Sequence, residues 1–239
     1  MHCEFKYGCI GEHLPHSFSR EIHNEIGSYA YDLKELTPEE LPAFMTARAF
    51  CGINVTIPYK QTIIPYLDAL SDEATAVHAV NTVLIQRTGN KFVTKGFNTD
   101  IIGFRQSLQG CDIPERALVL GTGGAAAAVS YVLERAGRQC TAVSRDEKRG
   151  LPYSALTAET IRQHRLIVNC TPVGTYPDIN KKPDIPYEGI SGEHFLYDLV
   201  YNPAATAFLK EGALRGARVL NGLPMLHAQA EAAWQLWNS

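Results

Sequence analysis

A glycine-rich turn in the second half of the chain restricts the possible folds more than any other feature. Residues 117–120 form a short, wholly apolar segment that runs directly into the sequence GTGGAA at 121–126, and an alanine-rich stretch follows to about Ala136. A strand, a turn of this spacing and a helix make the GxGxxA form of a dinucleotide-binding βαβ unit. We therefore expect the phosphates of a dinucleotide to lie against Gly121, Gly123, Gly124, Ala125 and Ala126.

The end of the next expected strand indicates which dinucleotide is bound. Units that bind NAD usually place Asp or Glu there to hold the ribose 2'-hydroxyl. This chain has Ser144 and Arg145 instead, with Arg149 four residues further on. A hydroxyl and two guanidinium groups suit the 2'-phosphate of NADP, because they form charge-assisted hydrogen bonds with it. The alternative is that Arg145, Lys148 and Arg149 are simply a solvated run of charge.

The pattern around the glycine turn predicts a Rossmann-type domain at 101–221. Apolar segments at 140–144, 166–170, 195–200 and 217–220 are typical of a parallel sheet covered on both faces. Helices are expected from Ile101 to Gly110, from the Asn202-Pro203 pair to Gly216, and over residues 223–237. The segment 176–192 is rich in Pro and Gly and is expected to be a loop.

The first hundred residues predict a smaller α/β domain with a mixed sheet. Strands are expected at 5–10 and 53–57, and residues 80–87 and 91–97 form a hairpin around the turn at 88–90. A capping box at 37–40 should open a helix that stops near Gly52, and Ser71 should begin another. The whole chain is therefore expected to be α/β with two domains.

Composition excludes several classes of protein. The 239 residues are 45% hydrophobic and 20% charged, which excludes extensive disorder. A formal charge of -3 gives no electrostatic footprint for nucleic acid or for an anionic membrane. The first thirteen residues mix charges with small residues where a signal peptide would need an apolar stretch, and the sequence has no CxxC pair and no HExxH motif. We therefore expect a cytoplasmic protein with reduced thiols and no metal. The expected partner is a small molecule, and the chain should be a monomer or a homodimer.

Several motifs, taken in order, resemble those of the shikimate dehydrogenase family. They are HSFS at 16–19, NVTIPYK at 54–60, AVNT at 79–82, NTD at 98–100, the glycine turn and arginine motif already described, NCTP at 169–172, YDLVY at 197–201, and GLPML at 222–226 with Gln229. The resemblance covers nearly the whole chain. It implies a substrate domain at 1–100, completed by the terminal helix at 222–239, and an NADP domain at 101–221. The active site would lie in the cleft between these domains.

The same resemblance implies the reaction. Members of the family reduce 3-dehydroshikimate to shikimate with NADPH, in chorismate and aromatic amino-acid biosynthesis, and they use the matching Lys60 and Asp100 as a catalytic pair. Residue types support these roles, since reducing a ketone creates an alkoxide that needs a proton, and a nearby carboxylate would hold a lysine ammonium in place. Without this context Lys60 would be read as a surface charge. Asp100 could also cap the helix that follows it.

The resemblance further assigns binding residues. The substrate carboxylate and hydroxyls would be bound by Ser17, Ser19, Thr56, Lys60, Asn81, Asp100, Tyr201 and Gln229. Beyond the glycine turn and Ser144, Arg145 and Arg149, the cofactor would contact Thr171, Val200, Gly222 and Met225. Hydroxyl and amide groups suit a polyol, because such a site rejects analogues that leave them unpaired. The alternative for Ser17 and Ser19 is to cap the helix that follows them.

Three departures from the family pattern stand out. Arg20 replaces the usual proline after HSxS, which adds a positive charge beside the expected carboxylate site. Asp146 replaces the usual threonine of the arginine motif, and the segment 150–163 is short enough to predict a truncated helix. Two other functions stay open: a quinate/shikimate dehydrogenase using NAD(P), and a nucleotide-binding regulatory homologue without turnover.

Overall fold

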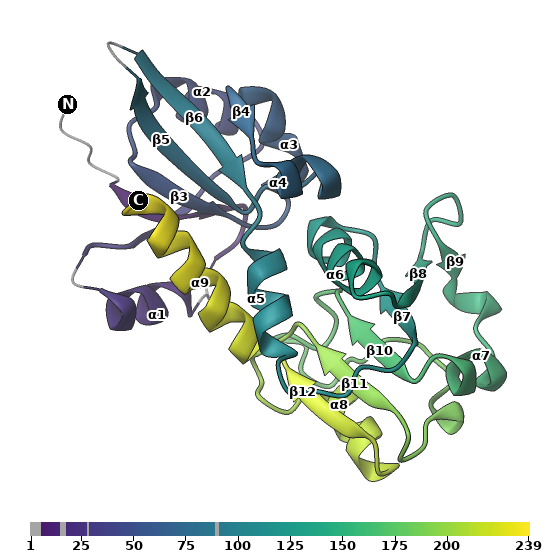
Figure 1. Ribbon diagram of the computed structural model, residues 1–239. Helices are drawn as coiled ribbons and strands as arrows, with labels where there is room; N and C mark the ends of the chain where they lie inside the picture. The colour runs from purple at the N-terminus through teal and green to yellow at the C-terminus, as the bar shows by residue number, and fades with distance from the viewer. Residues whose placement is uncertain (1–5, 15–17, 28, 89–90) are drawn as a thin grey trace. The chain divides into compact units, whose positions relative to one another are not determined.

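The computed structural model describes residues 6–14, 18–27, 29–88 and 91–239, and its contacts divide the chain into two compact units (Figure 1). The first unit is Met1–Gly103 with Leu226–Ser239, and the second is Phe104–Met225. Both boundaries fall inside helices, α5 (Asp100–Ser107) and α9 (Leu223–Trp237), within four residues of the boundaries at 100/101 and 221/222 that the sequence analysis expects. The mixed α/β architecture with two sheets agrees with the predicted fold class.

The first unit contains a mixed six-stranded sheet in the order β2-β1-β3-β5-β6-β4. Its strands are β1 (Tyr7–Gly11), β2 (Asp32–Glu35), β3 (Gly52–Val55), β4 (Ala69–Leu70), β5 (Thr82–Thr88) and β6 (Lys91–Phe97). β1 pairs in parallel with both β2 and β3, while β5 is antiparallel to β3 and β6. The predicted hairpin of β5 and β6 is therefore present, and residues 89–90 of its turn lie outside the described residues.

The helices of the first unit are short, and one differs from its predicted bounds. They are α1 (Ser19–Ile26), α2 (Leu41–Ala47), α3 (Tyr59–Thr62) and α4 (Asp72–Val77), with a 3-10 turn at Ile64–Tyr66. The capping-box residues form a turn ahead of α2, in which the amide of Thr37 donates to Oε2 of Glu40 at 2.8 Å. The prediction that this helix extends to Gly52 is wrong. It ends at Ala47 because Arg48 adopts a left-handed φ of 48°, and Gly52 begins β3 instead.

The terminal helix α9 packs against the sheet of the first unit. Trp237, near its end, is buried with Cys9 and Tyr31, and its indole nitrogen donates to the carbonyl of Val83 at 3.1 Å. An indole buried with its N–H bonded contributes a large apolar surface without leaving a polar group unpaired. α9 therefore belongs with the first hundred residues, although they are far apart in the sequence, and it carries Gln229 with it.

The second unit is built around six parallel strands in the order β12-β11-β10-β7-β8-β9. They are β7 (Arg116–Leu120), β8 (Gln139–Ser144), β9 (Leu151–Pro152), β10 (Leu166–Asn169), β11 (Phe195–Asp198) and β12 (Arg218–Asn221). Numbered within the unit, this is the order 3-2-1-4-5-6 of a dinucleotide-binding sheet, with the helix α6 (Gly124–Arg135) after its first strand. The Rossmann-type fold expected from the glycine turn is thus confirmed.

Three details of the second unit depart from or refine the sequence analysis. The helix expected to begin at the Asn202-Pro203 pair is α8 (Ala207–Leu214) and begins later, because Thr206 is its N-cap and accepts from the amide of Leu209. The truncated helix after the arginine motif is confirmed as α7 (Ala158–Gln163). The short strand β9 ahead of it was not predicted, since two residues are too few to show a period.

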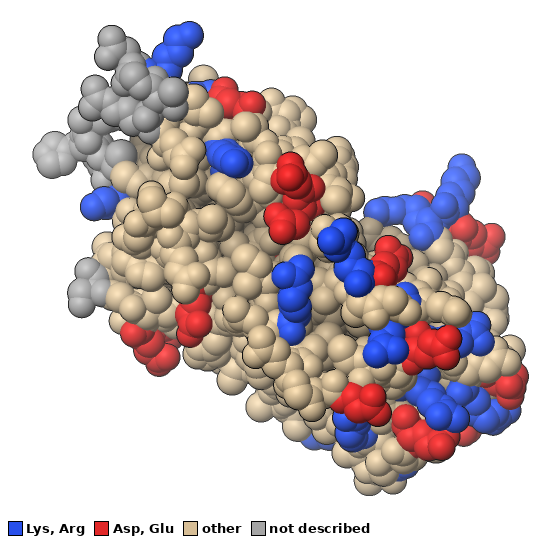
Figure 2. Space-filling model, in the orientation of Figure 1, with Lys and Arg blue, Asp and Glu red and all other residues tan. Residues whose placement is uncertain are grey.

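The core of the second unit lies on the two faces of the parallel sheet. Leu118, Ile167 and Leu196 from three adjacent strands are fully buried together with Phe208 of α8. Among the described residues, no helix is long and apolar enough to cross a membrane. On the face of the molecule shown in Figure 2, Lys and Arg side chains are interspersed with Asp and Glu and do not form one basic field.

Candidate active site and nucleotide site

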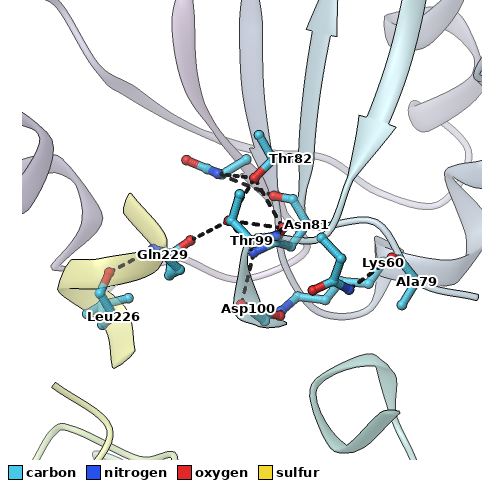
Figure 3. Close-up of polar contacts among 10 residues, drawn as sticks. Lys60, Ala79, Asn81, Thr82, Thr99, Asp100, Leu226 and Gln229 are labelled. Carbon is cyan, nitrogen blue, oxygen red and sulfur yellow. Dashed lines mark hydrogen bonds and ion pairs between the residues drawn. The ribbon is translucent and has the colours of Figure 1, made fainter. Parts of the chain in front are cut away.

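Lys60 and Asp100 form an ion pair in the first unit (Figure 3). The ammonium nitrogen of Lys60 lies 2.6 Å from Oδ2 of Asp100, and the two side chains are only 15% and 8% exposed. Lys60 sits on α3 just after β3, where its carbonyl accepts from the amide of Val80 at 2.7 Å. Asp100 is the first residue of α5. The predicted pair is therefore brought together from segments forty residues apart in the sequence.

The side chain of Asn81 fixes the second oxygen of this carboxylate. Its amide nitrogen donates to Oδ1 of Asp100 at 2.9 Å and to the hydroxyl of Thr99 at 3.0 Å. Its carbonyl oxygen accepts from the backbone amide of Thr99 at 2.7 Å and from the hydroxyl of Thr82 at 3.1 Å. Both amide hydrogens are thus used within the protein. Asn81 holds Asp100 in place, beyond any contact it makes with a ligand.

Gln229 reaches the same network from α9. Its Oε1 accepts from the hydroxyl of Thr99 at 3.5 Å, and its Nε2 donates to the carbonyl of Leu226 at 2.9 Å. The other hydrogen on Nε2 has no hydrogen-bond acceptor among the described residues and can be donated to a ligand. Asn54 extends the network on the opposite side, donating to Thr82 and accepting from the hydroxyl of Tyr31 at 2.7 Å. Asn54, Asn81, Thr82 and Thr99 are therefore buried and linked by hydrogen bonds around Asp100.

Of the other residues of the first unit that were predicted to bind substrate, Thr56 and Ser19 are described and Ser17 is not. Thr56 is half-buried just after β3, and its methyl group lies against Gly11, where an added Cβ would come within 2.7 Å of it. Ser19 begins α1 and hydrogen-bonds the Tyr31 side chain. The N-cap position of α1 is Phe18, which makes no side-chain cap hydrogen bond, and Ser19 is the first residue of the helix. Ser17 lies outside the described residues.

The unusual Arg20 is turned toward β2. Its Nε donates to the carbonyl of Tyr31 at 3.1 Å, and a terminal nitrogen lies 3.8 Å from the carboxylate of Asp32. Both charged side chains are about half exposed, at 48% and 49%. A partly paired, solvated charge of this kind has a short-range effect. The Arg20 side chain is therefore bound by Tyr31 and Asp32, both within the first unit.

The glycine turn of the second unit has the geometry that a dinucleotide requires. Gly121 adopts a φ of 112°, a conformation that favours glycine, and its amide donates to the carbonyl of Val143 at 2.8 Å. Gly123 precedes α6, and a Cβ built on it would meet nothing within 4 Å. No side chain caps α6. The amide hydrogens of its first turn, where Gly124, Ala125 and Ala126 lie, can therefore face phosphate.

The predicted 2'-phosphate residues gather around the end of β8. Ser144 is buried there, and its hydroxyl lies 3.5 Å from that of Thr122 in the glycine turn. Arg149 donates to the carbonyl of Thr122, while Arg145 is exposed. Asp146 is exposed, and its carboxylate accepts from the amide of Lys148 at 3.0 Å. Ser144 and Arg149 thus both contact Thr122 of the glycine turn, and the residue types at the end of β8, one hydroxyl and two arginines, fit the 2'-phosphate of NADP.

The remaining predicted cofactor residues follow β10, β11 and β12. Thr171, after β10, lies against Gly121, whose added Cβ would come 3.2 Å from the Thr171 methyl group. Val200 and Met225 are buried. Gly222 has no room for a side chain, because an added Cβ would lie 2.1 Å from the carbonyl oxygen of Leu199. Gly222 is therefore required for packing whether or not it contacts cofactor. Tyr201 is half-buried just after β11.

Sequence reasoning missed an important carboxylate in the second unit. Asp198 ends β11, is completely buried, and accepts hydrogen bonds from Asn169, Val200 and Thr206. Burial raises the pKa of Asp198 to about 6, although these three hydrogen bonds oppose the shift. Asp198 lies inside the YDLVY motif, so the motif was the available signal. Thr99, inside the NTD motif, was missed in the same way.

Comparison with known proteins identifies the family. The family model for the shikimate dehydrogenase substrate-binding domain matches residues 9–83, all of which belong to the first unit. The shikimate dehydrogenase (NADP(+)) of Carboxydothermus hydrogenoformans is 36% identical over 96% of this chain and 90% of its own length. That of Thermus thermophilus is 38% identical over 97% of this chain and 92% of its own length.

Solved structures agree with the sequence comparison. A shikimate dehydrogenase of Thermus thermophilus, in complex with NADP(H) and shikimate, has a TM-score of 0.85 and 37% identity, covering 98% of this chain and 93% of that one. The shikimate dehydrogenase of Aquifex aeolicus has a TM-score of 0.86 and 33% identity, covering 100% of this chain and 94% of that one. By fold, motifs and full-length similarity, the chain belongs to the family of NADP-dependent shikimate dehydrogenases.

Proposed function

We propose that this chain catalyses the reversible reduction of 3-dehydroshikimate to shikimate by NADPH, with Lys60 and Asp100 as its catalytic pair. The observation that carries the proposal is the buried ion pair between these two residues, 2.6 Å long, with the second carboxylate oxygen held by Asn81. An ammonium held by a fixed carboxylate is suited to give a proton to an oxygen and take it back.

The chemistry at the reacting oxygen follows from this arrangement. NADPH, when bound, supplies the hydride that reduces the ketone carbon. The carbonyl oxygen then gains negative charge, and Lys60 stabilises that charge and gives the oxygen a proton. Asp100 keeps the ammonium pointed toward the substrate and is itself fixed by Asn81. In the direction of shikimate oxidation, Lys60 accepts the hydroxyl proton.

The substrate is a small ring acid with several hydroxyl groups, and the available side chains suit it. We propose that Thr56, Asp100 and Gln229 contact its ring oxygens while Asn81 holds Asp100, and that Ser17 and Ser19, with Tyr201, bind its carboxylate. The free hydrogen on Nε2 of Gln229 supports this proposal. A site of hydroxyl and amide groups discriminates against analogues that leave those groups unpaired.

For the cofactor, we propose that the first turn of α6 holds the pyrophosphate and that Ser144, Arg145 and Arg149 hold the 2'-phosphate. The open space at Gly123 and the uncapped start of α6 support the first assignment. The second is supported by the last residue of β8, which is Ser144 where NAD-binding units usually have Asp or Glu. Thr171 and Val200 are proposed to line the nicotinamide side, with Gly222 and Met225 nearby.

A direct assay tests this function. The purified protein is given shikimate and NADP, and NADPH formation is followed by its absorbance. Parallel reactions replace shikimate with quinate and NADP with NAD. We expect the highest kcat/KM with shikimate and NADP. Turnover that favours quinate and NAD would assign the chain to the quinate branch, and absence of turnover together with NADP binding would indicate a regulatory protein.

A further inference from the structure

The carboxylate of Asp198 accepts hydrogen bonds from three places: the end of β10, the residues just after β11, and the N-cap of α8. Its Oδ1 accepts from Nδ2 of Asn169 at 2.9 Å and from the amide of Val200 at 3.0 Å. Its Oδ2 accepts from the hydroxyl of Thr206 at 2.6 Å. The side chain has no exposed surface. A carboxylate can accept all three hydrogen bonds at once, which a neutral side chain of this size cannot.

Asn169 links Asp198 to Thr171, in the loop after β10. Because a carboxylate only accepts hydrogen bonds, the atom of Asn169 that faces Asp198 must be its amide nitrogen. The carbonyl oxygen of Asn169 is then directed at Thr171, and accepts from its hydroxyl at 2.6 Å and from its backbone amide at 3.1 Å. Nδ2 of Asn169 also donates to the carbonyl of Val173 at 3.3 Å, so Asp198 and this carbonyl together fix which way the Asn169 side chain is oriented, with Asp198 the closer and charged acceptor.

Thr171 in turn lies against the glycine turn. An added Cβ on Gly121 would lie 3.2 Å from the Thr171 methyl group, so Thr171 leaves little room for a side chain at Gly121. β10 lies between β7 and β11 in the sheet, which places the ends of all three strands side by side. One buried carboxylate thus constrains Val200 directly and constrains Thr171 through Asn169.

We propose that Asp198 is a positioning residue for the nicotinamide end of the bound cofactor. The inference rests on the proposed function, because that function puts the nicotinamide beside Thr171 and Val200. Asp198 would act through its Oδ1 bonds to Asn169 and Val200. Its Oδ2 bond to Thr206, the N-cap of α8, contributes to stability instead.

Three variants separate these two functions of the carboxylate. Asp198→Ala removes every bond. Asp198→Asn can keep an oxygen at the Oδ1 position, so the bonds to Asn169 and Val200 survive. Thr206→Val removes the Oδ2 bond and the helix cap but leaves the Oδ1 bonds, and it is therefore the matched control for a loss of stability. Each protein is titrated calorimetrically with NADP and with 2',5'-ADP, which lacks the nicotinamide end.

We expect Asp198→Ala to weaken NADP binding about tenfold, as loss of a hydrogen bond to a charged group does, and to leave 2',5'-ADP binding within about twofold. Asp198→Asn and Thr206→Val should bind both ligands within about threefold of the unmodified protein. Equal losses for both ligands in Asp198→Ala, or a loss of NADP affinity as large in Thr206→Val, would show a purely structural role and overturn the inference.

A fourth variant, Asn169→Ala, covers the case in which Asp198→Ala does not fold. Asn169→Ala breaks the link between Asp198 and Thr171, together with a 3.3 Å bond to the carbonyl of Val173 in the same loop, and leaves the Asp198 bonds to Val200 and Thr206 in place. The same selective loss of NADP affinity is expected. Unchanged NADP binding in Asn169→Ala would contradict the inference. Because binding is measured without turnover, failure of the proposed function, seen as no reaction with shikimate and NADP in the unmodified protein, is distinguishable from failure of this inference.

Discussion

Asn81 donates a 2.9 Å hydrogen bond to Oδ1 of Asp100 and thereby leaves Oδ2 of the same carboxylate to the ammonium of Lys60. The amide is itself locked, because its oxygen accepts from the backbone amide of Thr99. Asn81 and Thr82 follow one another at the start of β5, and Thr99 and Asp100 follow one another at the start of α5. The pairing of these two short motifs therefore sets the direction of the catalytic ion pair.

Replacing Asn81 with Asp should damage catalysis more than folding. The variant side chain keeps an acceptor for Thr99 but brings a second carboxylate against Asp100, where like charges disfavour ionisation. We expect kcat/KM for shikimate to fall at least about tenfold, since the charge-assisted hydrogen bond to Asp100 is replaced by repulsion. Steady-state kinetics with a parallel thermal melt measure this. Unchanged kcat/KM would show that Asn81 does not orient Asp100.

We expect the preference for NADP or NAD to depend on charges of opposite sign near the end of β8. Arg145 and Arg149 can each bond a 2'-phosphate, and Asp146 brings a negative charge into the same exposed turn. In water-like surroundings a unit charge about 6 Å away costs under roughly 1 kcal/mol, which is less than one charge-assisted bond provides. We expect kcat/KM to favour NADP over NAD by at least about tenfold.

Two variants test that balance. Arg145→Ala should reduce the preference mainly by raising KM for NADP, and Asp146→Thr should widen it. Kinetics with both nucleotides decide the matter. Equal kcat/KM for NADP and NAD in the unmodified protein would mean that Asp146 has cancelled the phosphate site.

The substrate carboxylate is remote from the reacting carbon, so its contacts should be equally strong in the ground state and the transition state. Ser19→Ala should therefore raise KM for shikimate more than it lowers kcat. Ser19 also hydrogen-bonds Tyr31, and Tyr31→Phe serves as a control that removes this contact, together with the Tyr31 bond to Asn54, while keeping the Ser19 hydroxyl. An unchanged KM in Ser19→Ala would remove Ser19 from the binding site.

His23 should make the fold sensitive to acid. It is fully buried, stacked on Tyr31 with ring centroids 3.9 Å apart, and burial lowers the pKa of His23 from 6.5 to about 4. The folded state therefore favours the neutral ring. This contribution to stability is present above pH 6.5, the unfolded pKa, and is lost as the pH falls toward 4.

The size of the acid effect follows from the shift in pKa. A depression of this size corresponds to about 3 kcal/mol, lost between neutral pH and pH 4. Urea unfolding of the unmodified protein and of His23→Phe, at several pH values, isolates the contribution. The difference in unfolding free energy between the two proteins should fall as the pH is lowered. A difference that does not change with pH would contradict this account.

The sequence predicted the parts of the fold that depend on local pattern. The glycine turn was predictable because its backbone geometry admits few residues, and α9 was predicted with its observed bounds because its apolar face is long. The end of α2 was not predictable, since Arg48 in a left-handed conformation leaves no signal in the sequence. Helix α8 was predicted to begin at Asn202, but its N-cap is Thr206. The Thr206 hydroxyl also donates to Asp198, and such a tertiary contact leaves no pattern in the local sequence.

The candidate site shows the same division. Family motifs indicated Lys60 and Asp100, but a motif contains no information on geometry. Only the structure shows that both amide hydrogens of Asn81 are donated to Thr99 and Asp100. Asp198 escaped notice because a lone Asp in an apolar strand has no periodicity to mark it. Its importance comes from donors on two other segments, Asn169 and Thr206, that meet only in the folded chain.

The turnover of Lys60→Ala, compared with that of Lys91→Ala, tests the central claim most directly. Lys91 is an exposed lysine at the start of β6 and should tolerate the change. Because proton transfer is required chiefly in the transition state, Lys60→Ala should lower kcat by a factor on the order of 10² or more and leave KM for shikimate within a few-fold. Near-normal kcat in Lys60→Ala would contradict the assignment of Lys60 and Asp100 as the catalytic pair.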